Sequence, residues 1–271
     1  MPPSGVSVRS AGYRDLVSGS PGDPVEAGRH AMRIEVAVML AVTFGVSAVV
    51  AVLQLADAVL SGLPGYRVRL NPDQSRHDLV NLGLNLASVG QLVAWGLLGL
   101  YLLWRTGIRP RDIGLGRVRV GPDLLGGLGL AALIGIPGLL LFLVGRAVGL
   151  NADVEPSALQ DTWWRVPVLV LAAFANGFAE EVVVVGYLIT RLKQLGCSPR
   201  TAVLASSALR GLYHLYQGFG AGLGNVAMGL VFGYVWCRTG RLWPLVIAHG
   251  VIDTVAFVGY ALLAGRLSWL G

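Results

Sequence analysis

Residues 166–190 read VPVLVLAAFANGFAEEVVVVGYLIT, and this stretch by itself indicates the class of the protein. Its 25 residues are apolar apart from Asn176, the adjacent pair Glu180 and Glu181, and two residues near its end. A helix rises about 1.5 Å per residue, so a helix of this length can cross the roughly 30 Å of hydrocarbon in a bilayer. The stretch therefore predicts a transmembrane helix that carries two carboxylates inside the membrane.

Six further apolar runs accompany this stretch, at residues 36–60, 79–104, 123–148, 201–216, 221–237 and 242–264. The fourth and fifth of these six are only 16 and 17 residues long, so they could cross only with little tilt or with local thinning of the bilayer. The composition agrees, because 13% of the residues are charged, whereas a soluble domain has about 25%. The sequence predicts an all-α fold, a polytopic transmembrane helical bundle of about seven spans in a cell membrane.

The first 32 residues differ from the rest in composition. They are rich in Gly, Ser, Pro and charge, and they lack the apolar core of a signal peptide. Such a composition cannot bury enough apolar surface to offset the entropy of ordering. We therefore expect a disordered cytoplasmic tail over residues 1–32 and a transmembrane helical domain over residues 33–271.

The basic residues are distributed unevenly between the two predicted sides of the membrane. The tail and the alternate loops on its side hold 14 Arg and Lys residues, and the loops on the opposite side hold 6. The positive-inside rule therefore predicts a cytoplasmic N-terminus and an external C-terminus. The same rule explains the net charge of +6, so we expect the lipid bilayer as a partner and no nucleic acid.

Ionisable side chains lie inside the predicted spans, where each costs about 2.5–3.5 kcal/mol to insert and therefore indicates a functional site. All of the strongest candidates fall in the last four spans. Pairs spaced four residues apart share one helix face, whereas adjacent residues point about 100° apart, so Glu180 and Glu181 are not expected to face one site. The candidate set is Glu180, Glu181, Arg210, His214, His249 and Asp253, with Asn176 and Asn225 as polar support.

Three short motifs carry a resemblance to a known family. Residues 179–188 read AEEVVVVGYL, residues 210–214 read RGLYH, and residues 249–253 read HGVID, soon after LWP. In this order and on separate apolar runs, they resemble the motifs of the CPBP intramembrane proteases, also called the Abi or type II CAAX prenyl endopeptidase family. The resemblance covers about residues 160–262. It implies an intramembrane endopeptidase whose substrate is a membrane-associated peptide or protein.

The sequence departs from the family pattern at two positions. The arginine that follows the glutamates in the family is Val185 here, and the aromatic residue four positions before the first histidine is Arg210. Glu181 thus lacks its usual partner while an arginine stands one helix away. Our hypothesis is that Arg210 takes over the charge pairing with Glu181.

The resemblance also implies roles for the candidate residues. Glu180 would act as general base on a water, and His214 would share that water or protonate the leaving group. His249 would stabilise the oxyanion, held by Asp253. The four side chains Glu180, His214, His249 and Asp253 could also hold zinc or another divalent metal, so a metalloprotease and a metal-free glutamate protease both remain open.

Two other functions fit a membrane bundle with buried charges. One is a catalytically inactive membrane scaffold or immunity-type protein on the same fold. The other is a proton-coupled transporter, which also buries Glu, His and Asp. Transporters are commonly built from repeated halves, and the crowding of polar residues into one half of this chain argues against that class.

Overall fold

The computed structural model describes residues 24–263 and confirms an all-α helical bundle. Two short strands and three single turns of 3₁₀ helix connect the helices. The helices are α1 (Pro24–Val42), α2 (Phe44–Ser61), α3 (Asp78–Arg105), α4 (Val120–Ala147), α5 (Arg165–Glu180), the π-helical segment η4 (Glu181–Tyr187), α6 (Leu188–Gln194), α7 (Pro199–Tyr213), α8 (Phe219–Thr239) and α9 (Trp243–Leu263).

Six helices in the described part of the chain are long and apolar enough to cross a membrane. The predicted fifth span in chain order, residues 201–216, is not among them. The helix at this place, α7, has 15 residues and is therefore only about 22 Å long. The predicted sixth span is longer than expected, since α8 extends over 21 residues. The six are α2, α3, α4, the continuous unit α5–η4–α6, α8 and α9.

The N-terminal region differs from its prediction in two ways. Helix α1 begins at Pro24, so the last part of the predicted disordered tail is helical, and residues 1–23 lie outside the described residues. The predicted single run 36–60 is also two helices. Thr43 adopts a non-helical conformation between them, and its hydroxyl donates to the Met39 carbonyl at 2.7 Å. A hydroxyl bonded back to the preceding turn offers the chain an alternative to the helical ladder.

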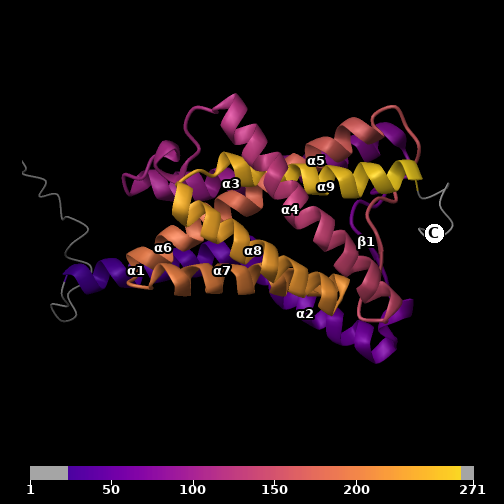
Figure 1. Ribbon diagram of the computed structural model, residues 1–271, viewed down its shortest axis with the longest axis horizontal. Coiled ribbons are helices and arrows are strands. Elements are labelled where there is room, and N and C mark those ends of the chain that lie inside the picture. Colours follow the sequence, from indigo (N-terminus) through magenta and orange to yellow (C-terminus); the bar gives the residue numbers. More distant parts are fainter. Residues whose placement is uncertain (1–23, 264–271) are drawn as a thin grey trace, which may run out of the picture.

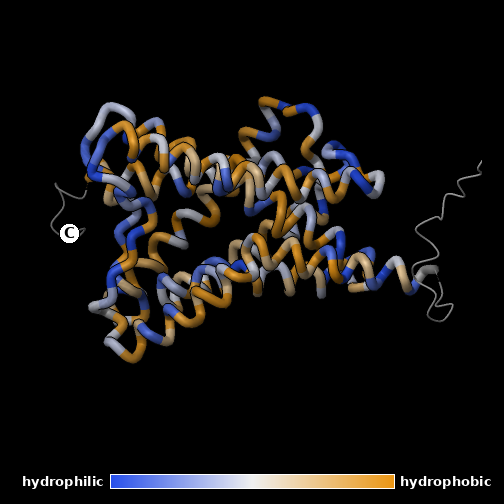
Figure 2. Tube along the Cα trace, turned by 180° about the vertical axis from the view of Figure 1, so that it is seen from behind, coloured by the Kyte–Doolittle hydropathy of each residue, from blue (hydrophilic) through white to orange (hydrophobic). Residues whose placement is uncertain are grey.

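The helices form two layers that run along the long axis of the molecule (Figure 1). One layer contains α3, α5 and α9, and the other contains α2, α7 and α8, with α4 crossing between them. The most extensive packing is between α5 and α9 and between α7 and α8. Hydrophobic residues dominate the middle of the molecule, and hydrophilic residues gather toward its two ends (Figure 2).

The unit α5–η4–α6 is the central helix of the bundle. In an apolar stretch of 18 residues of this unit, 67% is buried inside the protein, whereas the corresponding share is 39% or less in every other candidate span. The four valines 182–185 are all fully buried. A helix surrounded by other helices can keep charged side chains away from lipid, and this is where both glutamates lie.

A two-stranded parallel sheet joins two loops at one end of the bundle. Strand β1 (Arg67–Arg69) follows the 3₁₀ turn η2 (Leu63–Gly65), and strand β2 (Asp153–Glu155) precedes α5. Val68 is paired with Val154 in the register. The sheet fixes the loop between α2 and α3 against the loop between α4 and α5.

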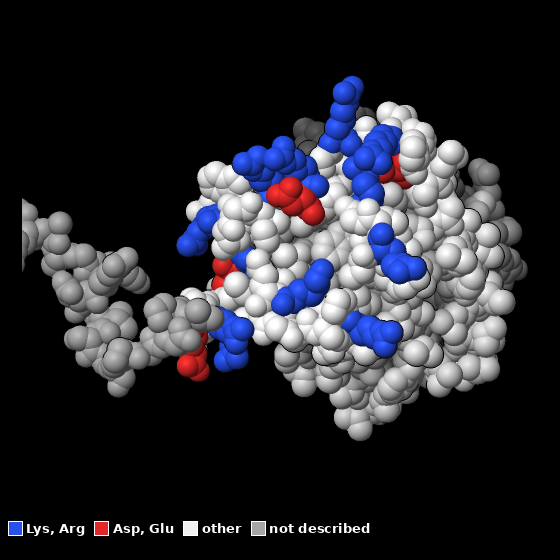
Figure 3. Space-filling view, turned by 60° about the vertical axis from the view of Figure 1, so that its left-hand side comes forward, with Lys and Arg blue, Asp and Glu red and all other residues white. Residues whose placement is uncertain are grey.

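The opposite end of the bundle carries an arginine-rich face (Figure 3). This face includes the link between α3 and α4, with its 3₁₀ turn η3 (Pro110–Ile113), and the link between α6 and α7. It is the distribution that the positive-inside rule predicts for a cytoplasmic side. Its exposed basic residues are Arg105, Arg109, Arg111, Arg117, Arg119, Lys193, Arg200 and Arg238.

Candidate functional site

Helices α5 and α9 approach closely enough for their polar side chains to meet. Gly177 and Gly250 lie at the contact, and a Cβ on Gly177 would come within 3.0 Å of the Gly250 nitrogen and 3.1 Å of the His249 Cβ. A side chain at either position would push the helices apart. Small residues allow this approach in membrane helices, and here they bring His249 against the central helix.

Arg210 and Glu181 form the ion pair that the sequence predicted. The Arg210 Nη2 donates to Glu181 Oε1 at 2.6 Å, and both side chains are fully buried. The guanidinium also lies over the Phe232 ring, with 5.7 Å between Cζ and the ring centroid. The pairing hypothesis is confirmed, because the arginine on α7 reaches the carboxylate that lacks an arginine on its own helix.

Both glutamates border one polar cluster, so the prediction that they face different sites is wrong. Glu181 Oε1 also contacts His249 Nδ1 at 2.7 Å, and Glu180 Oε2 accepts a hydrogen bond of 2.6 Å from the Tyr213 hydroxyl. Two features explain the difference. The helix changes to the wider π geometry at Glu181. The partners of the two carboxylates also come from two different helices, α7 and α9, so each carboxylate finds a polar partner although the two point in different directions.

The ring of His249 is oriented by Glu181 more closely than by Asp253. Because Glu181 is paired with Arg210, its carboxylate accepts and the His249 Nδ1 donates. The distance from His249 Nε2 to Asp253 Oδ2 is 3.6 Å, beyond a hydrogen bond. Asp253 is instead held by Asn176, whose Nδ2 donates to Oδ2 at 2.9 Å. The predicted support from Asn176 thus acts on Asp253.

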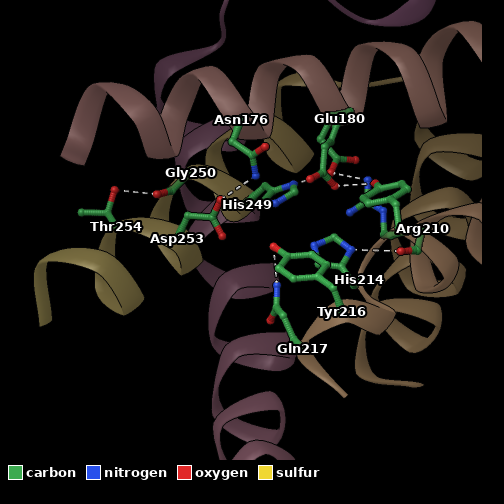
Figure 4. A network of polar contacts seen from close by, with 12 residues as sticks. Asn176, Glu180, Arg210, His214, Tyr216, Gln217, His249, Gly250, Asp253 and Thr254 are labelled. Carbon is green, nitrogen blue, oxygen red and sulfur yellow. Dashed lines mark hydrogen bonds and ion pairs between the residues drawn. The ribbon is translucent and has the colours of Figure 1, made fainter. Parts of the chain in front are cut away.

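His214 follows the last residue of α7 and does not lie on the helix face as predicted. Its Nδ1 donates to the Arg210 carbonyl at 2.9 Å, since a carbonyl can only accept. The other ring nitrogen lies on the side of Tyr216 and His249 (Figure 4). Figure 4 shows the His214 ring in the same group of side chains as Glu180 and His249. The structure therefore brings the four predicted catalytic side chains around one cluster.

The sequence interpretation missed two tyrosines and placed one asparagine wrongly. Tyr213 bonds to Glu180, and Tyr216 stands beside His214 in Figure 4. The available signal was the position of Tyr213 beside a half-buried histidine and three residues after a buried arginine, one helical turn away. Asn225 donates to the Ala221 carbonyl of its own helix at 3.1 Å, and no hydrogen bond links it to the cluster within residues 24–263.

The predicted metal ligands do not assemble into a metal site in the described part of the chain. No group of three or more His, Cys, Asp or Glu side chains there is placed to hold an ion. The Nδ1 atoms of both histidines are engaged, which leaves Nε2 of each ring, and Tyr213 occupies one oxygen of Glu180. Because the described side chains are not gathered around one point, we derive no step through a metal.

Three buried polar atoms of the ion pair have no partner among the described residues. They are Glu181 Oε2, Arg210 Nε and Arg210 Nη1. Buried polar atoms of this kind are usually satisfied by internal water, which makes about three hydrogen bonds at such sites. The cluster thus has the chemistry to hold water at membrane depth.

Comparison with known proteins agrees with the motifs. The sequence of residues 162–255 matches the family described as type II CAAX prenyl endopeptidase Rce1-like. No curated protein and no solved structure matches the chain. The matched segment extends from the loop before α5 to the middle of α9, so it contains every residue of the cluster. Over the segment that builds its polar cluster, the chain is therefore similar to the Rce1-like type II CAAX prenyl endopeptidase family.

Proposed function

We propose that the protein is an intramembrane endopeptidase that hydrolyses a peptide bond in a membrane-associated protein or peptide. One observation carries this proposal: carboxylates and imidazoles from three separate helices meet in a single buried cluster. Glu180 and His249 are each only 3% exposed. Burying these groups among lipid-facing helices is expensive, and catalysis is the function that uses a carboxylate and two imidazoles together.

Glu180 is the proposed general base. It would take a proton from a water, and the resulting hydroxide would attack the carbonyl carbon of the scissile bond. The Tyr213 hydroxyl fixes one Glu180 oxygen and leaves the other for the water. When the C–N bond breaks, the leaving amine would receive that proton from Glu180 or through His214.

His249 is the proposed donor to the oxyanion. Its Nδ1 donates to Glu181, so Nε2 can donate to a substrate oxygen when the ring is the doubly protonated imidazolium, the form that the neighbouring carboxylates of Glu181 and Asp253 favour. A donor fixed before the reaction needs no reorganisation when charge develops on the oxygen. Arg210 and Glu181 are positioning residues in this scheme, because they orient His249 without touching the reacting atoms.

The orientation in the membrane belongs to the same proposal. The arginine-rich face would lie in the cytoplasm, with the N-terminus on that side of a cell membrane. The substrates would be peptides that reach the bundle from a membrane or from its surface.

The test is cleavage by the purified full-length chain and its Glu180→Gln variant in liposomes, with a pool of fluorescence-quenched decapeptides as the probe. The wild-type chain should cleave members of the pool, and Glu180→Gln should lower the rate at least a hundredfold with an unchanged unfolding temperature. Glu26→Gln, an exposed glutamate on α1, is the matched control. No cleavage by the wild-type chain would refute the proposal and favour an inactive scaffold, and equal cleavage by Glu180→Gln and wild type would refute Glu180 as the general base.

A further inference from the structure

A cavity of about 430 Å³ lies between α2, β1 and the end of α7. Its walls combine one face of α2, Tyr66 with the strand β1, and two aromatic rings, one at the end of α7 and one just after it. The side chains from the helices are Val46, Ser47, Val50, Gln54, Tyr213 and Tyr216. The scheme above does not use this cavity.

The cavity adjoins the proposed catalytic cluster. Tyr213 forms part of its wall, and the hydroxyl of the same tyrosine donates to Glu180 at 2.6 Å. Within the cluster, side chains outside the Arg210–Glu181 ion pair are also more exposed to solvent. The side chains of Arg210 and Glu181 are 0% exposed, whereas that of Asp253 is 16% exposed. Access to Glu180 is therefore closed on the side of the ion pair.

Strand β1, whose residues line the cavity, has an unpaired edge. The described residues form a sheet of two strands only, so β1 pairs with β2 on one side and with no strand on the other. The ladder bonds involve the Tyr66 carbonyl and the Leu70 amide. Because backbone groups alternate in direction along a strand, the amides and carbonyls of Arg67 and Arg69 point to the free edge. A free edge is the template to which an extended peptide adds.

The lining combines polar and apolar side chains. Ser47 and Gln54 lie on α2, within a candidate membrane span, and Tyr213 and Tyr216 also line the cavity. An extended peptide in the membrane has backbone groups that must be satisfied. The strand edge and these side chains can satisfy them, while Val46 and Val50 contact apolar side chains.

We propose that this cavity is the docking groove for the substrate, which binds as an extended peptide added to the free edge of β1 with its scissile bond delivered past Tyr213 to Glu180. The inference rests on the proposed peptidase function and adds the substrate conformation and the entry route. Alternate backbone amides of the peptide pair with β1, and apolar side chains pack on the α2 face.

The first test compares two tryptophan substitutions on adjacent residues of α2. Val50→Trp fills the groove, whereas Val49→Trp lies outside it on the same helix; the two valines are 45% and 61% exposed. With a cleaved decapeptide as probe, Val50→Trp should raise KM at least tenfold, and Val49→Trp should leave it unchanged. N-methylation of alternate amides of that peptide should raise KM for one set of positions and not the other. Equal KM values for the two variants would overturn the groove.

The second test does not depend on cleavage. In a chain with Cys197→Ser and Cys237→Ser, the rate at which a maleimide modifies Ser47→Cys is measured with and without the decapeptide pool, and Val49→Cys is the control. Peptide should slow modification of the groove cysteine only. Protection without cleavage would support the groove and refute the peptidase. Cleavage without protection, together with a harmless Val50→Trp, would refute the groove and leave the peptidase intact.

Discussion

Exchanging the positions of the buried arginine tests whether the Arg210–Glu181 pair organises the site. The double variant Val185→Arg with Arg210→Phe moves the guanidinium onto the helix of Glu181, four residues away, and places an aromatic ring on α7. Val185 is fully buried in the π-helical segment, close to one turn from Glu181. A guanidinium there would reach the carboxylate from its own helix, and the new phenylalanine would face Phe232.

The magnitudes follow from burial. Arg210→Phe leaves Glu181 as a buried charge beside His249 alone, and removing one partner of a buried pair costs about 3–5 kcal/mol. Val185→Arg alone places a second cation among valines near Arg210 and should also cost about 3 kcal/mol or more. In the double variant one carboxylate faces one guanidinium again. We expect the combined loss to be about 2–3 kcal/mol smaller than the sum of the single losses.

Equilibrium unfolding in mixed micelles measures this coupling, with the fluorescence of the seven tryptophans as the signal. Val184→Arg with Arg210→Phe is the matched control, because residue 184 is equally buried but points about 100° away from residue 185. The control pair should be additive. If Arg210→Phe alone costs less than about 1 kcal/mol, or if both cycles are additive, the ion pair does not hold the site together.

Three further predictions concern single groups and sidedness. Tyr213→Phe removes the hydrogen bond to Glu180 and should lower kcat about tenfold and the free energy of unfolding by about 1.5–3 kcal/mol, the contribution of a hydrogen bond to a charged group; an unchanged kcat contradicts the role of this hydroxyl. Asn225→Ala should leave cleavage and binding unchanged because its amide bonds to its own helix, and a tenfold loss would place it in the site after all. A membrane-impermeant maleimide should modify the exposed Cys237, beside the arginine-rich face, only after the membrane is opened, and modification in intact cells would reverse the orientation.

The features that could be predicted from sequence are those that follow from the free-energy cost of burying a charged side chain. A charged side chain in an apolar run must find a partner, so an unpaired Glu181 and an unexpected Arg210 in a neighbouring run could be matched before any coordinates. The membrane class followed from length and hydropathy in the same way. The membrane argument needs only the solvent and the chain, whereas the choice of Arg210 as the partner of Glu181 also used the departures from the family pattern at positions 185 and 210.

The features that could not be predicted depend on geometry that leaves no local pattern. The π-helical turn occurs within a run of valines, and nothing in that run distinguishes it from regular helix. Strands β1 and β2 have three residues each and lie far apart in the sequence, so their pairing has no periodic signal. Tyr213 resembled a packing aromatic because its hydroxyl partner is on another helix.

The arginine on α7 does more than replace a missing charge. A single oxygen, Glu181 Oε1, accepts from both Arg210 Nη2 and His249 Nδ1, so the pair also fixes the acceptor that orients His249. Arg210 further accepts the hydrogen bond from His214 through its own carbonyl. The residue therefore links the imidazole on α9 to the imidazole at the end of α7. The guanidinium acts on Glu181 and, through it, on His249, whereas the bond to His214 is made by the main chain and would remain with any side chain at position 210. The departure at Val185 therefore moves the partner of Glu181 to α7 and leaves the position of His214 unchanged.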